Sequence, residues 1–217
     1  MPKNGRIKHR AELPPVRKMK FSVVIPSFLG SYSGAASRRD EKLVRAVQSV
    51  LDQTFQDFEI QVVADGCQQT VELMKHFTDE RVHVTLIPKA PLWDGAPRNT
   101  GIDKAEGEFI VYLDIDDYWG ENHLQIISDG LKDYDWVFFN DYIYRDEWIE
   151  RHCDINRLGQ NGTSNICHRK SLGARWVHRG YGHDHHFNQS LMMKSRKYAK
   201  ISTPEYFVCH IPGQYDL

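Results

Sequence analysis

An apolar stretch that runs straight into three carboxylates constrains this chain more than any other feature. Residues 109–113 read Phe-Ile-Val-Tyr-Leu, and Asp114, Asp116 and Asp117 follow directly. Five mostly apolar residues predict a strand covered on both faces, as in a parallel sheet. In open α/β sheets, ligands bind beyond the carboxyl ends of the strands. The sequence therefore puts three acids where a ligand would bind.

Two of these acids stand at a spacing that suits a cation. Asp114 and Asp116 are two residues apart, so in an extended chain their side chains point the same way. Carboxylates directed at one place repel each other unless a cation lies between them, and oxygen ligands suit Mg²⁺ or Mn²⁺ better than Zn²⁺. An Asp-rich turn that caps the next helix, with Asp117 as the cap, is the alternative for this stretch alone.

Strand-like and helix-like segments alternate over the first 118 residues. The predicted strands are 21–26, 58–64, 82–87 and the stretch from 109, and the predicted helices are 40–53, 71–77 and 98–105. This order indicates βαβ units on a parallel sheet with right-handed crossovers. Asp40 is expected to cap the first helix, whose apolar face would hold Leu43, Val44, Val47, Val50 and Leu51.

The segments beyond the acids are shorter. We expect a helix at 124–131, strands at 136–140 and 142–148, and a polar loop over the site at 151–165. A helix at 187–193 and a strand at 205–209 follow. With 217 residues, 41% of them apolar, one domain over residues 21–217 can bury a core.

Charge and cysteine content limit the setting of the protein. The net charge is −1, but residues 1–20 carry seven Lys or Arg against Glu12, which indicates a flexible basic arm or a solvated tail without function. The four scattered cysteines predict free thiols of a reducing compartment. No apolar run approaches 18 residues and no signal peptide is apparent, so a soluble cytoplasmic protein is expected.

Five sequence blocks, taken in order, resemble a known family. They are Val23-Val-Ile-Pro-Ser-Phe28, Ser49 to Ile60, Val62-Val-Ala-Asp-Gly66, Arg98-Asn-Thr-Gly-Ile102 and Ala105 to Asp117. Together they resemble the family-2 nucleotide-sugar glycosyltransferases. The resemblance implies a GT-A fold, which is α/β with a Rossmann-like, mostly parallel sheet flanked by helices. Residues 21–118 would form the nucleotide-sugar half and residues 119–217 an acceptor-side half.

The resemblance also implies where the donor lies. The base and ribose would lie against Pro26, Ser27 and Phe28, and Asp65 would read the nucleobase. Members of the family often have two acids at that place, whereas this chain has Ala64 before Asp65. The base is therefore less well defined, although a UDP-sugar is the expected donor.

A metal and a diphosphate would meet at the D-x-D block. The resemblance makes Asp114 a ligand of ribose or metal, Asp116 a metal ligand and Asp117 a further donor-binding residue, with Mn²⁺ or Mg²⁺ on the donor diphosphate. Arg98 would face the diphosphate or a uracil carbonyl, or else form a salt bridge with an acid at the sheet end. His210 would complete the metal site, or serve a structural role.

The catalytic base is implied at Gly182-His-Asp184. In similar enzymes an Asp at this place removes the proton of the acceptor hydroxyl, although His183 stands here where the family usually has Glu. A zinc site in His183-Asp-His-His186 is disfavoured because adjacent side chains rarely converge on one ion. The tryptophans near the presumed cleft could stack on a sugar or base, or pack in the core; they are Trp93, Trp119 and Trp176.

These assignments predict an inverting, metal-dependent glycosyltransferase that acts on an acceptor hydroxyl. A nucleotidyltransferase acting on a sugar phosphate is one alternative, but the loop 27–37 lacks the basic residue its phosphate loop needs. A non-catalytic nucleotide- or glycan-binding module is the other. The acceptor would be a glycan, a glycoconjugate or another hydroxylated molecule, and the basic arm permits a polyanion such as modified nucleic acid.

Overall fold

The structure is a computed structural model, and it describes residues 20–92, 95–177, 180, 182–203 and 205–217. The expected basic arm lies outside these ranges except for Lys20, whose Nζ donates a hydrogen bond to Ser128 Oγ over 3.0 Å. Trp93 also lies outside them. No helix within the described ranges is both long enough and apolar enough to cross a membrane.

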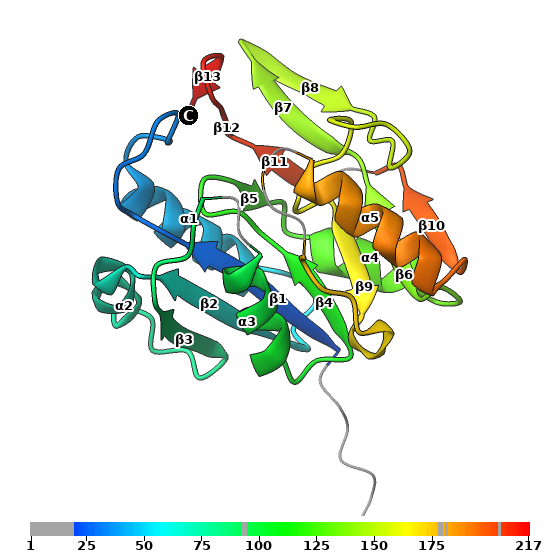
Figure 1. Ribbon diagram of the computed structural model, residues 1–217, viewed down its shortest axis with the longest axis horizontal. Coiled ribbons are helices and arrows are strands. Elements are labelled where there is room, and N and C mark those ends of the chain that lie inside the picture. Colours follow the sequence, from blue (N-terminus) through cyan, green and yellow to red (C-terminus); the bar gives the residue numbers. More distant parts are fainter. Residues whose placement is uncertain (1–19, 93–94, 178–179, 181, 204) are drawn as a thin grey trace, which may run out of the picture.

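A seven-stranded sheet forms the centre of the molecule, in the order β10-β6-β9-β4-β1-β2-β3 (Figure 1). Strands β4, β1, β2 and β3 are parallel neighbours, β10 is parallel to β6, and β9 runs antiparallel to both β4 and β6. The strands are β1 Phe21–Ser27, β2 Phe58–Asp65, β3 Val82–Ile87, β4 Phe109–Tyr112, β6 Trp136–Phe139, β9 Ile166–Arg169 and β10 Tyr198–Ile201.

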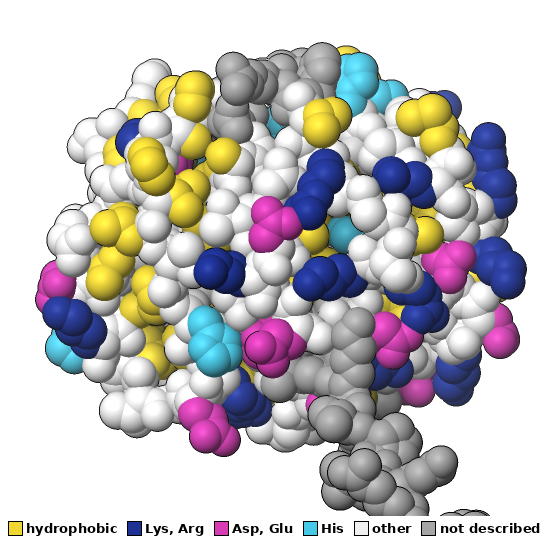
Figure 2. Space-filling view, turned by 60° about the horizontal axis from the view of Figure 1, so that its bottom comes forward, with side chains coloured by type: hydrophobic (Ala, Val, Ile, Leu, Met, Phe, Trp, Pro, Cys, Tyr) yellow, Lys and Arg dark blue, Asp and Glu magenta, His cyan; other side chains and the backbone are white. Residues whose placement is uncertain are grey.

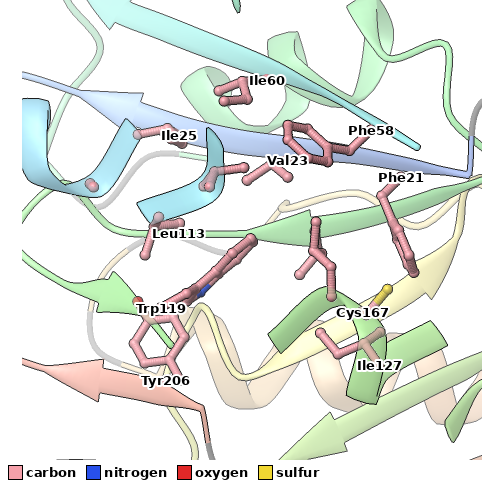
Figure 3. Close-up of a cluster of buried hydrophobic side chains, with 14 of the residues drawn as sticks. Phe21, Val23, Ile25, Phe58, Ile60, Leu113, Trp119, Ile127, Cys167 and Tyr206 are labelled. Atoms are coloured by element: carbon pink, nitrogen blue, oxygen red, sulfur yellow. The ribbon is translucent and has the colours of Figure 1, made fainter. Parts of the chain in front are cut away.

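Helices cover both faces of this sheet (Figure 1). They are α1 Arg39–Leu51, α2 Gln68–Met74, α3 Ala96–Lys104, α4 His123–Gly130 and α5 His183–Lys194. Because side chains alternate along a strand, Val23 and Ile25 of β1 pack with α1 and α4, whereas Val24 packs with α3 and α5. Figure 3 shows the first of these clusters.

A second, four-stranded sheet in the order β5-β11-β7-β8 lies beside the large one. Its strands are β5 Tyr118–Trp119, β7 Asp141–Arg145, β8 Glu147–Arg151 and β11 Tyr206–Val208, and a hairpin of β12 His210–Ile211 and β13 Tyr215–Asp216 follows. Trp119 and Tyr206 pair across β5 and β11 and join the core cluster of the large sheet (Figure 3). The small sheet is thereby fixed against the strand ends.

The expected order of strands and helices over residues 21–118 is confirmed, whereas β9 and β10 were not expected and the start of α1 differs from the prediction. The cap position is Arg38, which is left-handed at φ 44°, and no side chain caps the helix. Asp40 lies in the first turn instead, so its prediction as the cap is wrong. The buried face includes Ala46, whereas Val44 is 37% exposed. Arg39 fixes the loop that precedes the helix, because its guanidinium donates to the carbonyls of residues 28–30.

The acidic stretch is a turn, not an extended strand. β4 ends at Tyr112, and the N–H of Asp117 donates to the carbonyl of Asp114 over 3.2 Å. The argument that Asp114 and Asp116 point the same way along a strand is therefore wrong, although the turn keeps all three acids at the sheet edge. The expected strand 142–148 is likewise a hairpin, since Asp146 between β7 and β8 has φ 63°.

Candidate active site

A cavity of about 400 Å³ opens at the carboxyl ends of the central strands, where α/β sheets bind ligands. It is lined by every predicted site residue except Asp184: Pro26, Ser27, Phe28, Asp65, Arg98, Asp114, Asp116, Asp117 and His210. These residues come from β1, β2, α3, the turn after β4 and β12. The parallel sheet thus gathers side chains that are far apart in the sequence.

An ion pair occupies one end of the cavity. Nζ of Lys89 lies 2.7 Å from an Asp65 carboxylate oxygen, and the N–H of Ala90 donates to the other oxygen over 2.6 Å. The same Nζ lies 4.4 Å from the centre of the Phe28 ring. The sequence analysis missed Lys89. It follows β3, so the rule that parallel strands present their ends at one edge could have found it.

A second ion pair lies at the middle of the cavity. Arg98 donates to Asp114 over 2.7 Å, which is the sheet-end salt bridge left open as the alternative for this arginine. The Thr163 hydroxyl donates to the other carboxylate oxygen of Asp114 over 3.3 Å. Thr163 lines the cavity from within the loop 151–165, which was expected to lie over the site.

The acidic turn has the electrostatics of a cation site. Burial, and then the charge of Asp114, raise the pKa of Asp116 to about 6, while His210 and Lys42 oppose the shift. A divalent ion between the two carboxylates would relieve this repulsion, and Mg²⁺ typically binds one or two carboxylates together with substrate phosphates. The donor set therefore fits such an ion, although the described residues contain no group of three or more His, Cys, Asp or Glu side chains placed to hold a metal unaided.

The carboxylate of Asp117 forms hydrogen bonds within the protein. Its two carboxylate oxygens accept hydrogen bonds from the Tyr206 hydroxyl over 2.8 Å and from the Cys209 N–H over 2.9 Å. Burial, followed by the charges of Asp116 and Asp114, raises its pKa well above the usual range. Asp117 thereby fastens the acidic turn to β11, and its expected contact with the donor stays a prediction.

His210 fastens the C-terminal hairpin to the loop before α1. Its Nε2 lies 2.9 Å from the carbonyl oxygen of Gly34, and its Nδ1 lies 3.1 Å from the Asp216 carboxylate. Asp216 also accepts from the N–H of Ser37 and from the buried Lys42. Because a carbonyl can only accept, Nε2 carries a proton in this arrangement and is not a metal ligand there.

The expected base lies next to the cavity and does not line it. Helix α5 begins at His183, four residues before its expected start at 187, so both His183 and Asp184 are in its first turn. His183 lines the cavity, and burial, followed by the charge of Arg98, lowers its pKa. Asp184 accepts a hydrogen bond from the His185 N–H over 2.7 Å.

Two of the candidate stacking residues belong to the core. Trp119 and Trp176 are each 3% exposed. Trp176 stacks on Phe187 with ring centres 3.9 Å apart, and the Arg98 guanidinium lies 5.2 Å from the Trp176 ring. For these two tryptophans the packing alternative is correct, and Trp176 acts on the site by supporting Arg98.

Known proteins share this sequence pattern. The model of the family described as glycosyl transferase family 2 matches residues 22–198. The succinoglycan biosynthesis protein ExoW of Rhizobium meliloti is 34% identical over 109 residues, which make up 48% of this chain and 32% of ExoW. The chain therefore spans about a third of the length of that relative.

Solved structures share the fold. Staphylococcus aureus TarS 1–349 in complex with UDP-GlcNAc has a TM-score of 0.70 at 19% identity, over 91% of this chain and 60% of that one. The mannosyltransferase PcManGT from Pyrobaculum calidifontis, in complex with GDP-Man and Mn²⁺, has a TM-score of 0.63 at 15% identity, over 92% and 59%. This likeness confirms the GT-A fold, and because the family model covers most of the sequence, the chain belongs to glycosyl transferase family 2.

Proposed function

We propose that this protein moves a sugar from a nucleoside-diphosphate sugar, with UDP as the expected nucleotide, to the hydroxyl of an acceptor. The observation that carries the proposal is one cavity that joins the family's donor-binding positions to the acidic turn. The transfer is proposed to be metal-dependent and to invert the anomeric centre.

The donor diphosphate is proposed to lie at the acidic turn, with Asp114 and Asp116 sharing Mn²⁺ or Mg²⁺ with it. The ion would neutralise charge on the leaving nucleoside diphosphate. The mutual repulsion of the two carboxylates supports this placement. The complexes of TarS with UDP-GlcNAc and of PcManGT with GDP-Man and Mn²⁺ support a nucleotide sugar and a divalent ion in those proteins.

Arg98 and His210 would change partners when the donor binds. Arg98 is paired with Asp114 in this structure, and an ion on Asp114 would compete for that carboxylate and free the guanidinium for the diphosphate. Through Nε2, His210 could ligate the ion only after that nitrogen gives up the Gly34 carbonyl, whereas its Nδ1 lies 3.1 Å from the Asp216 carboxylate.

Asp184 is proposed as the base that takes the proton of the acceptor hydroxyl as its oxygen attacks the anomeric carbon. A single base opposite the leaving group implies inversion without a covalent intermediate. The support is its place in the first turn of α5, directly after the cavity-lining His183. The neutral ring of His183 leaves Asp184 with one negative neighbour fewer than the usual Glu would give it.

The acceptor is proposed to be a glycan or another hydroxylated molecule. A relative, TarS, is described as a poly(ribitol-phosphate) β-N-acetylglucosaminyltransferase. The two proteins are 28% identical over 111 residues. On the face drawn in Figure 2, Lys and Arg lie among Asp and Glu and form no single-sign field.

The test is calorimetry with UDP-, GDP- and CDP-sugars, each with and without Mn²⁺. We expect Mn²⁺ to increase the affinity of the wild type for a UDP-sugar, and Asp116→Ala to abolish that increase. Asp129→Ala, which removes an exposed acid of α4, serves as the control and should behave like the wild type. Equal affinities with and without Mn²⁺ in the wild type would refute the metal assignment, and absence of binding to any nucleotide sugar would refute the function.

A further inference from the structure

We propose that Arg45 is a positioning residue for the divalent ion. By holding the backbone carbonyl of Asp116, it keeps the carboxylate of Asp116 beside that of Asp114. The proposal rests on the proposed function, because it assumes that these two acids share an ion with the donor diphosphate. It goes further by naming a residue that does not line the cavity and yet sets the affinity for the ion.

Arg45 reaches the acidic turn from helix α1. Its Nη2 donates a hydrogen bond to the carbonyl oxygen of Asp116 over 2.7 Å. A charged donor makes a hydrogen bond roughly twice as strong as a neutral one. The bond is therefore a firm anchor, and it acts on the backbone of the residue whose side chain is proposed to bind the ion.

The neighbouring acids of the turn are anchored through their side chains. Both oxygens of the Asp117 carboxylate accept hydrogen bonds, and so do both oxygens of the Asp114 carboxylate. Asp116 differs, because within the described ranges no other residue donates to its carboxylate. Its position therefore depends on the backbone, and Arg45 holds that backbone from outside the turn.

Aromatic rings hold the guanidinium of Arg45 in turn. Its Cζ lies 5.1 Å from the centre of the Tyr118 ring. Tyr118 stacks on Phe207 of β11 with ring centres 4.8 Å apart and planes 6° apart, and Phe207 stacks on Tyr142 of β7. The planar guanidinium of arginine stacks on aromatic faces in a way that the compact ammonium of lysine does not. The small sheet thus supports the side chain that fixes Asp116.

Two further residues of α1 bind the chain that follows the turn. Ser49 and Gln53 lie four and eight residues after Arg45, so all three face the same side of the helix. The N–H of Trp119 donates to the Ser49 hydroxyl over 3.2 Å, and Gln53 donates to the carbonyl of Gly120 over 2.7 Å. These two contacts hold the backbone beyond the turn. Ser49 therefore provides a matched control for Arg45.

Positioning by Arg45 and the mere presence of its charge predict opposite effects. A positive charge next to two acids repels a cation, so by charge alone the removal of Arg45 would strengthen ion binding. Without a positioning residue, the charge of Asp114, which acts on Asp116, would drive the turn apart and ion binding would weaken. The direction of the change separates the two roles.

Calorimetry with UDP, with and without Mn²⁺, tests the proposal by measuring the gain in UDP affinity that Mn²⁺ produces. Arg45→Met should reduce this gain about tenfold or remove it, because the loss of a residue that orients a metal ligand typically costs ten- to hundredfold in metal affinity. UDP affinity without Mn²⁺ should stay at the wild-type level. A titration of Mn²⁺ alone, followed by the electron paramagnetic resonance of the free ion, should show the same loss.

Three further variants distinguish positioning from general destabilisation. Ser49→Ala should lower the melting temperature and keep the full gain from Mn²⁺. Arg45→Lys keeps the charge and a donor but loses the planar contact, so its gain should lie between those of the wild type and Arg45→Met. Tyr118→Leu removes the ring under the guanidinium and should reduce the gain by less than Arg45→Met. If Arg45→Met does not fold, Arg45→Lys and Tyr118→Leu decide the matter, because each should still lose part of the gain.

Several results would overturn the proposal. A gain from Mn²⁺ that is kept or increased in Arg45→Met would leave Arg45 without a positioning role. An equal loss in Ser49→Ala would trace the effect to general loosening of the segment, and an equal loss of UDP affinity with and without Mn²⁺ would trace it to the nucleotide. If Mn²⁺ gave the wild type no gain, the metal assignment of the proposed function would fail together with this inference. A normal wild-type gain that Arg45→Met does not reduce would remove the inference alone.

Discussion

Residues 21–118 and residues 119–217 build the two sides of the same cavity by different means. The first region supplies four neighbouring parallel strands, β4, β1, β2 and β3, whose buried side chains are mostly apolar, with a hydrogen-bonded polar set at Ser22, Glu59 and Gln61. The second supplies short strands divided between two sheets, and polar contacts hold many of them in place. One example is the ion pair between the buried Asp141 of β7 and the partly exposed Arg151 of β8.

The contacts that attach the second region span long stretches of chain. Tyr206 bonds to Asp117, 89 residues away, and His210 bonds to Gly34, 176 residues away. A regular sheet is specified by the alternation of side chains along each strand. An irregular region depends instead on particular pairs of side chains. Under the proposed function, the first region would carry most of the donor contacts and the second would carry the catalytic base.

Replacing the proposed base tests this division most strongly. Asp184→Asn should lower turnover roughly 10²- to 10⁴-fold, because general base catalysis contributes about that much. Its donor affinity should stay at the wild-type level, because Asp184 is not among the proposed donor contacts. Steady-state kinetics and calorimetry with the donor measure the two quantities separately.

His183→Gln is the matched control, because it alters the neighbouring cavity-lining residue and keeps the carboxylate of Asp184. We expect it to lose far less turnover than Asp184→Asn. The opposite order, with the larger loss for His183→Gln, would move the proton transfer to the imidazole. Near-normal turnover in both variants would show that neither side chain on α5 is the base.

The alternation of elements made the first region predictable. The strand-like runs at residues 21, 58, 82 and 109 each became a strand of the large sheet, because short runs of this kind alternate with helical segments in a βαβ pattern. The cap of α1 was not predictable from its sequence. Arg38 adopts a left-handed conformation there and Arg39 binds the preceding loop, and both depend on tertiary contacts.

The site was predictable as a set of positions but not as a set of contacts. A resemblance places Asp65, Arg98 and Asp114 in one cavity. It cannot show that Lys89 neutralises Asp65, because that ion pair joins the ends of two strands across 24 residues. In the same way Asp117 looked like a ligand in the sequence, and only the position of β11 showed both its oxygens in use.

Lowering the pH should destabilise the second region more than the first, because two buried histidines lie in it. Burial lowers the pKa of His123 to about 3 and that of His168 to about 4, from an ordinary value near 6.5. Between these values the unfolded chain binds more protons, so each histidine adds stability above pH 6.5 that is lost as the pH falls toward 4. Each should contribute about 1.4 kcal/mol per pH unit in that range.

Asp116 acts in the opposite direction, since its raised pKa of about 6 makes the folded state bind the extra proton. A comparison of variants isolates the histidine. His123 packs among Trp119 and Phe139, and its Nε2 has no hydrogen-bond partner within the described residues. His123→Phe should therefore fold at pH 7 and gain about 2 kcal/mol relative to the wild type by pH 5. A parallel pH dependence of the two urea-unfolding free energies would contradict this.

The smallest effect is expected at the start of α1, where the regular region departs from the expected helix cap. Asp40 lies in the first turn and makes no capping hydrogen bond, so only its charge near the positive end of the helix stabilises the protein. Asp40→Ala and Asp40→Asn should then cost the same, about 0.3–0.5 kcal/mol, and high salt should abolish the difference from wild type.

A cap would behave otherwise. Asn caps as well as Asp, so Asp40→Asn would be neutral and Asp40→Ala would cost about 1 kcal/mol at any salt concentration. Thermal unfolding of the three proteins at low and high salt therefore distinguishes a helix end set by its own side chains from one set by the contacts of Arg39 with the loop before it.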